Sequence, residues 1–301
     1  MINTFKPSVL LSSASLVFTA LLPVASWAAV DNQVPSCYNI QGLDQKPPKI
    51  DKELFLLIDQ TTPLDDELKR SVLSNVGQVA VPGSKFVVGK FSSFGQGRYF
   101  EILAAGAIEP GLTQDKRDSI GKKPLAEFDS CLTKQADYAR KLVAGSIRKA
   151  FEGISPSLNR SDIMDSFKRL SDRIRTSEAK DKLVFLVSDM IENSSVTSFY
   201  AKNTVREIDP KKEFQLSTDH EVLPNTGAAR IYVLGAGLIQ APNQSKSQNS
   251  EVYREPQKMI ALRKFWEMYF SAGGATLEEF GAPALVRPLG WTTPLLLGER
   301  K

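Results

Sequence analysis

The sequence is poor in the residues that relay protons or bind soft metals. Its 301 residues include a single histidine and two cysteines. Catalysis that depends on a histidine relay therefore has one candidate, His220. Because His220 stands in a polar stretch, we expect it to be a surface residue and not a catalytic one.

Strong net charge and long apolar runs are also scarce. The chain has 38 Lys and Arg against 34 Asp and Glu, a net charge of +4 that becomes 37 − 34 = +3 without the first 28 residues. This mild excess is spread along the chain and gives no reason to expect a nucleic-acid partner. Beyond the N-terminus no segment is long and apolar enough to cross a bilayer, so we expect no membrane span after removal of the leader.

The N-terminus has the layout of a secretory signal. Residues 1–28 combine the positive Lys6, an apolar middle and the small-residue exit Ser26-Trp27-Ala28. We expect cleavage after Ala28, with Ala29 as the alternative site, and a periplasmic or secreted protein. An uncleaved anchor helix is the other interpretation, because the apolar run is close to the roughly 20 residues of a membrane span.

The remaining chain divides into three parts. We expect an N-terminal extension at 29–49, one large domain at 50–280 and a C-terminal tail at 281–301. The two cysteines lie in different parts, Cys37 in the extension and Cys131 in the domain. In an oxidising compartment they can form a disulfide that ties the two together, and two separate buried thiols are the alternative.

Buried-strand patterns alternate with helical ones along the domain. ELFLLID at 53–59 and DKLVFLVSD at 181–189 are short, nearly continuous apolar runs, which are typical of strands buried on both faces of a parallel sheet. Apolar runs at 85–94 and 98–108, joined by two glycines and a glutamine, predict an antiparallel hairpin. Further patterns predict helices at 125–154, 163–174 and 254–274, and strands at 230–238 and 275–280. We therefore predict an α/β fold, doubly wound, with a mostly parallel sheet, one antiparallel edge strand and helices on both faces.

Several finer expectations concern helix ends and loops. Thr62 is placed to cap the first helix, with Pro63 at its first position. Residues 109–124 have the composition of a loop, residues 200–228 are irregular with at most a short helix, and 241–250 form a polar loop. We expect the aromatic stripe of the last helix to be core packing and not a ligand platform. Its members are Phe265, Trp266, Tyr269 and Phe270.

Two acids stand where buried strands end. Asp59 and Asp189 close their strands, and Ser161 precedes a helix. In open α/β sheets ligands bind at the carboxyl ends of the strands, so these side chains can face one crevice. Carboxylates and hydroxyls without histidine or cysteine are ligands for Mg²⁺, Mn²⁺ or Ca²⁺ and not for zinc. The alternatives are that Thr61, Thr62 and Ser161 cap helices, and that Asp59 pairs with a lysine or arginine.

These residues and their order resemble a von Willebrand factor A domain, over about residues 50 to 280. The first strand of that family ends in an Asp-x-Ser-x-Ser loop, to which a Thr before a helix and an Asp after the fourth strand add a metal-ion-dependent adhesion site. Asp59 matches the first Asp, Thr61 the first Ser, Ser161 the Thr and Asp189 the last Asp. Pro63, which has no side-chain oxygen, stands in place of the second Ser. The resemblance therefore implies a weak or vestigial site.

The resemblance implies an exported protein-binding module rather than an enzyme. Its partner would be an envelope or surface protein whose acidic side chain completes the coordination of the ion. A second hypothesis is a metal-free scaffold of the same family that binds through the 200–228 excursion and the tail. A third is a metal-dependent hydrolase or phosphatase, although haloacid dehalogenase phosphatases require an Asp two positions after the first, where this chain has Thr61.

Overall fold

The computed structural model describes residues 32–92, 100–154, 161–201, 204–239 and 255–292. The expected signal segment, its cleavage site and the 241–250 loop lie outside these residues. Within the described part of the chain, no helix has the length and apolar character that spanning a membrane requires.

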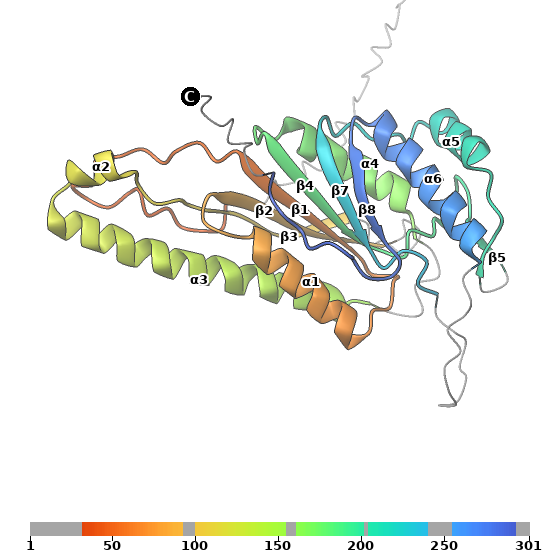
Figure 1. Ribbon diagram of the computed structural model, residues 1–301, viewed down its shortest axis with the longest axis horizontal. Coiled ribbons are helices and arrows are strands. Elements are labelled where there is room, and N and C mark those ends of the chain that lie inside the picture. Colours follow the sequence, from red (N-terminus) through yellow and green to blue (C-terminus); the bar gives the residue numbers. More distant parts are fainter. Residues whose placement is uncertain (1–31, 93–99, 155–160, 202–203, 240–254, 293–301) are drawn as a thin grey trace, which may run out of the picture.

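One six-stranded sheet forms the centre of the molecule (Figure 1), and its strand order is β3-β2-β1-β4-β7-β8. Only β3 is antiparallel to its neighbour, and the other pairs are parallel. The strands are β1 (Lys52–Asp59), β2 (Ser84–Phe91), β3 (Phe100–Ile108), β4 (Asp181–Val187), β7 (Ala229–Leu234) and β8 (Thr276–Gly281). This is the predicted doubly wound sheet, with the predicted antiparallel strand at its edge.

Helices cover both faces of the sheet, so the molecule has three layers (Figure 1). Helices α1 (Asp66–Val79) and α3 (Lys122–Glu152) pack on one face through Val72, Val76 and Ile147. Helices α4 (Ile163–Thr176) and α6 (Pro256–Ala272) pack on the other face, and α5 (Pro210–Asp219) lies against α6. The aromatic stripe of α6 is fully buried, as predicted, and burial of each such side chain contributes about 2–3 kcal/mol.

A small lobe stands beyond the β3 edge of the sheet. It consists of the N-terminal segment from Asn32, helix α2 (Gln114–Asp118) and the first half of α3 (Figure 1). The predicted disulfide is present and joins Cys37 to Cys131. Glu109 lies buried beneath it and accepts hydrogen bonds from Ser36 Oγ at 2.6 Å, from the Cys37 N–H at 2.8 Å and from Gln135 Nε2 at 2.8 Å. The lobe therefore has its own covalent and polar anchors.

The tail after β8 packs against the domain as far as Thr292. Leu289 is buried, and its N–H donates to Asn75 Oδ1 at 3.0 Å. Trp291 Nε1 donates to the carbonyl of Val79, and the Thr292 N–H donates to Asp181. These contacts connect the end of the sequence to α1 and to the start of β4.

Three local predictions were wrong. Helix α1 begins at Asp66 and is capped by Asp65, whose side chain accepts from the Leu68 N–H at 2.8 Å, so Thr62 and Pro63 precede it. The 109–124 segment contains α2, and α3 starts at Lys122 with Pro124 in its first turn, where proline is tolerated. The excursion after β4 holds the short hairpin of β5 (Tyr200–Ala201) and β6 (Thr204–Val205) besides the one short helix expected. His220 is exposed, as expected.

Candidate metal site at the carboxyl ends of the strands

The candidate site lies where the strand order reverses, between β1 and β4. The two strands are parallel with Ile58 beside Val187, so Asp59 and Ser188 follow as neighbours. Side chains alternate along a strand, and residues 55 and 57 of β1 face the same core as 184 and 186 of β4. Asp59 and Ser188 continue these two rows on the α4–α6 side of the sheet.

Four hydrogen bonds hold the Asp59 carboxylate. Its Oδ1 accepts from the N–H of Thr61 at 2.8 Å and from Thr61 Oγ1 at 2.6 Å. Its Oδ2 accepts from Ser161 Oγ and Ser188 Oγ, both at 2.8 Å. Asp59 is only 1% exposed. Its described partners are hydroxyl and amide groups, and the expected alternative of a basic partner is not seen among the described residues.

Asp189 lies beside Asp59 and has fewer donors. Its Oδ1 accepts from the Ile191 N–H at 2.8 Å. Burial raises the pKa of Asp189 well above its usual value, and the negative charge of Asp59 raises it further. Burial also raises the pKa of Asp59, although the hydrogen bonds from Thr61, Ser161 and Ser188 act in the opposite direction. Two carboxylates that oppose each other's ionisation are therefore close together at this rim.

The loop residues Thr62 and Pro63 contribute no ligand to this cluster. The Thr62 hydroxyl is buried and accepts from the Asp189 N–H at 2.9 Å, so it braces the backbone of the opposite loop. Pro63 lacks a side-chain oxygen. Pro63, where the resemblance leads one to expect a serine, therefore adds no side-chain oxygen to the cluster around Asp59.

Ser161 is placed by the start of α4 but does not cap it. The cap is Asp162, whose side chain accepts from the Asp165 N–H at 3.3 Å. Glu192, in the segment after β4, also stabilises this helix end. Its Oε2 accepts from the N–H groups of Ile163 at 2.9 Å and Met164 at 3.1 Å. The Ser161 hydroxyl is thereby left to donate to Asp59.

Glu192 is itself an unusual group. It is fully buried, and among the described residues its Oε1 has no hydrogen-bond partner. Burial raises its pKa well above the usual value, and the nearby charge of Asp162 raises it further. The Ser194 side chain and the two α4 N–H groups act in the opposite direction.

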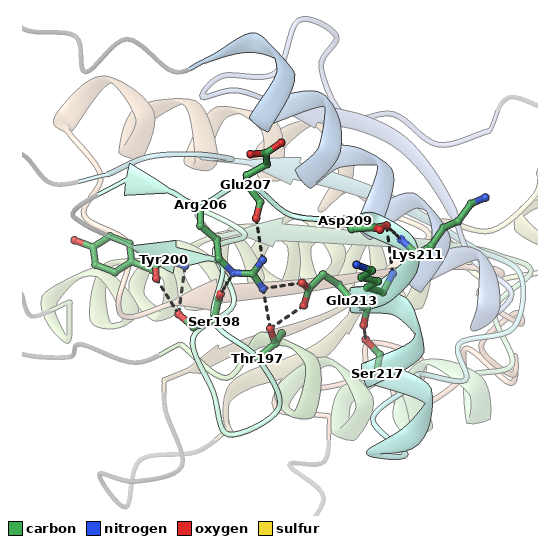
Figure 2. A network of polar contacts seen from close by, with 10 residues as sticks. Thr197, Ser198, Tyr200, Arg206, Glu207, Asp209, Lys211, Glu213 and Ser217 are labelled. Carbon is green, nitrogen blue, oxygen red and sulfur yellow. Dashed lines mark hydrogen bonds and ion pairs between the residues drawn. The ribbon is translucent and has the colours of Figure 1, made fainter.

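The segment after β4 lies beside the site. The Asn193 N–H donates to the Ser161 carbonyl at 2.9 Å, which attaches this segment to the site. Figure 2 shows how its outer part is fixed to α5: Arg206 donates to Glu213 at 2.7 Å and to Thr197 Oγ1 at 3.1 Å, and Thr197 Oγ1 donates to Glu213 at 2.7 Å. The hairpin is therefore held by the buried Glu213 carboxylate, which accepts from two donors, Arg206 and Thr197.

The four residues proposed as metal ligands lie together, with one addition. Asp59, Thr61 and Ser161 are joined by hydrogen bonds, and Asp189 is close enough for its charge to couple with that of Asp59. Sequence reasoning missed Ser188, which directly precedes Asp189. Pairing β1 with β4 so that Asp59 lies beside Ser188, and not beside Asp189, would have found it.

The donor set suits a hard cation but is sparse. It contains two carboxylates and three hydroxyls, which are oxygen ligands of the kind that Mg²⁺ and Mn²⁺ accept. Among the described residues, no three His, Cys, Asp or Glu side chains come together in a group able to hold a metal ion. An ion here would depend on water and on the lone pairs of the three hydroxyls, which donation to Asp59 leaves available.

Comparisons with known proteins say little about function. No family model and no curated protein matches the sequence. Among solved structures, the chain is similar to an aerotolerance-related membrane protein from Bacteroides fragilis NCTC 9343, crystallised with multiple mutations to serines. That match has a TM-score of 0.30 and 9% sequence identity, over 75% of this chain and 90% of the other. At this level the likeness carries no information about ligands or partners.

Proposed function

We propose that this chain is a von Willebrand factor A-like, exported protein-binding module that uses a degenerate metal-ion-dependent adhesion site. The observation that carries the proposal is the pairing of Asp59 with Asp189 at the switch point of the sheet, with no described basic partner between them. A divalent cation between the two carboxylates would relieve their mutual repulsion. The hydroxyls of Thr61, Ser161 and Ser188 would supply further oxygens.

Partner binding would use the open side of the ion. Because Pro63 supplies no oxygen, the ion would lack one of its protein ligands. It would therefore attract an acidic side chain from a partner. The partner is then an envelope or surface protein that presents an aspartate or glutamate. The proposed export of the chain places it where it would meet such a partner.

The test follows the thermal midpoint during titration with Mg²⁺ and Mn²⁺. A ligand that binds only the folded state stabilises it by about 1.4 kcal/mol at ten times its Kd, which raises the midpoint by a few degrees. We expect this rise in the wild type and its loss in Asp59→Ala and Asp189→Ala. Asp65→Asn is the matched control, because it removes an exposed acid from the same rim and asparagine still caps a helix. An equal rise in all four proteins would contradict the proposal.

A metal-free scaffold is the second candidate, and one observation favours it. Both oxygens of Asp59 already accept two hydrogen bonds each, so the cluster is satisfied without an ion. In this case partners would bind through the loops around the rim. Absence of a midpoint shift at millimolar metal in the wild type would favour this function.

A hydrolase is the least favoured candidate. The residue two positions after Asp59 is Thr61, whose hydroxyl donates a hydrogen bond to Asp59 itself. Thr61 therefore offers no general acid. Phosphatase and esterase assays with divalent metal present, comparing the wild type with Asp59→Ala, would detect such an activity. We expect none in either protein.

A further inference from the structure

A second surface lies on the lobe, away from the rim. It is a groove of about 680 Å³ on the first half of α3, and its floor includes Pro35, Ala126, and Cys131 of the disulfide. Tyr138 lines one end and is 48% exposed, one of few large apolar side chains in the described structure that solvent reaches to this extent. An apolar groove with an exposed tyrosine is typical of a binding surface.

The groove is preorganised. The disulfide fixes Cys131 to the N-terminal segment, and Gln135 Nε2 donates to the Pro35 carbonyl at 2.7 Å and to buried Glu109. The two sides of the groove are therefore tied to each other by covalent and hydrogen bonds. A partner that binds here would cost little ordering of the protein.

The charges at the border are mainly positive. Lys123 and Lys134 are exposed and have no ion-pair partner among the described residues. Glu127 is the one acid among the residues that line the groove. The two lysines are eleven residues apart on one helix, which is close to three turns, so both lie on the same side about 16 Å apart. In an extended peptide, residues six apart point to the same side and lie about 20 Å apart, at roughly 3.3 Å per residue. The flexible lysine and glutamate side chains span the difference from about 16 Å.

We infer that this groove binds an extended acidic segment of a partner protein, with apolar side chains between two carboxylates. The carboxylates meet Lys123 and Lys134, and the apolar side chains lie on the floor beside Tyr138. Its concave shape suits a peptide better than a flat membrane surface. This site is separate from the proposed ion site and does not depend on it.

The test is an NMR titration of the full chain with an acetylated, amidated heptapeptide, Glu-Ser-Leu-Ser-Phe-Ser-Glu, whose two glutamates and two apolar side chains share one face when the peptide is extended. We expect saturable shifts of amide signals from α3 residues of the groove, such as Ala126 and Ser130. The Lys123→Glu/Lys134→Glu variant should bind about tenfold more weakly, because two surface attractions become repulsions. Lys211→Glu/Lys212→Glu is the matched control, since it reverses two exposed lysines on α5 across the sheet, and should bind like the wild type.

Spacing gives a second arm. A heptapeptide of the same composition with its glutamates adjacent reaches only one lysine and should bind more weakly than the first. The inference is overturned if no saturable shift occurs, if the two peptides bind equally, or if the Lys123→Glu/Lys134→Glu variant binds like the wild type while keeping its thermal midpoint. A response of the groove signals to phosphatidylglycerol vesicles but not to the peptide would assign the surface to a membrane and also overturn it.

Discussion

At the scale of single residues, the main feature is a buried carboxylate that has no basic partner in the described part of the chain. Asp59 accepts four hydrogen bonds from hydroxyl and amide groups. A buried carboxylate is costly unless it is hydrogen-bonded, and here the hydroxyls meet that requirement. A hard cation would bind to the same oxygens, so one cluster could stabilise the metal-free protein and also hold the proposed ion.

The raised pKa values predict how stability depends on pH. Folded-state pKa values of Asp59, Asp189 and Glu192 lie above those of the unfolded chain, mainly because of burial. The folded protein therefore binds more protons than the unfolded chain above about pH 4, and these groups make stability fall as the pH rises through their folded-state pKa values. Urea denaturation without metal at pH 5 and pH 8 measures this, because the contribution of these groups to the free energy of unfolding should be lower at pH 8 than at pH 5.

The Asp189→Asn variant isolates one of these groups. It removes a half-buried charge that repels Asp59, so its free energy of unfolding should exceed that of the wild type at pH 8. At pH 5 the difference should be smaller, because protonation already neutralises part of this charge. A variant that is destabilised equally at both pH values would show that the charge of Asp189 is not the cause.

At the scale of elements, α3 connects the lobe to the rim. Its 31 residues extend over about 46 Å. At its C-terminal end, Gln60 is buried directly after Asp59, and its Nε2 donates to the Ala150 carbonyl at 3.2 Å. Gly153 leaves room for this side chain, because a Cβ added there would lie 1.8 Å from Gln60 Nε2.

Two glycine-to-alanine changes at this helix should therefore have opposite effects. Gly153→Ala should destabilise by about 1–2 kcal/mol, because it displaces Gln60 from its buried hydrogen bond. Gly145→Ala lies on the exposed face of α3 with no atom near the added Cβ, and should stabilise by about 0.5–1 kcal/mol. Chemical denaturation measures both, and stabilisation by Gly153→Ala would contradict the packing described.

The hairpin after β4 depends on one ion pair. Arg206→Ala leaves Glu213 buried with Thr197 as its remaining side-chain donor, so we expect a loss of about 1–3 kcal/mol and faster hydrogen exchange over residues 193–205. Arg263→Ala removes an arginine from an exposed pair with Glu267 and should change stability by less than about 0.5 kcal/mol. Equal effects of the two changes would show that the network in Figure 2 does not hold the hairpin.

At the scale of the whole molecule, the sequence predicts the sheet better than its surroundings. Strands β1 and β4 are apolar on both faces, and an acid stands at the end of β1 and two residues after the end of β4, so their burial and the rim that they share follow from pattern alone. The start of α1 does not, because Thr62 and Asp65 are both possible caps, and the Thr62 hydroxyl is instead used to accept from the Asp189 N–H. Ser188 needs the strand register, which no local signal gives.

The disulfide joins the N-terminal segment of the lobe to helix α3 across 94 positions of sequence. Closing so long a loop restricts the unfolded chain, so we expect Cys37→Ser/Cys131→Ser to lose about 2–5 kcal/mol of unfolding free energy. Wild-type protein in reductant should lose a similar amount. Unchanged denaturation midpoints in both cases would mean that the bond contributes nothing to the stability of the whole chain.

The central claim is that the acids closing two neighbouring strands can share a hard cation. Anomalous X-ray scattering from crystals grown with Mn²⁺ tests this most directly. The account predicts an anomalous peak within coordinating distance of Asp59 and Asp189, with Ser161 or Ser188 turned toward it. Crystals grown at saturating Mn²⁺ that show no anomalous peak at this rim would contradict it.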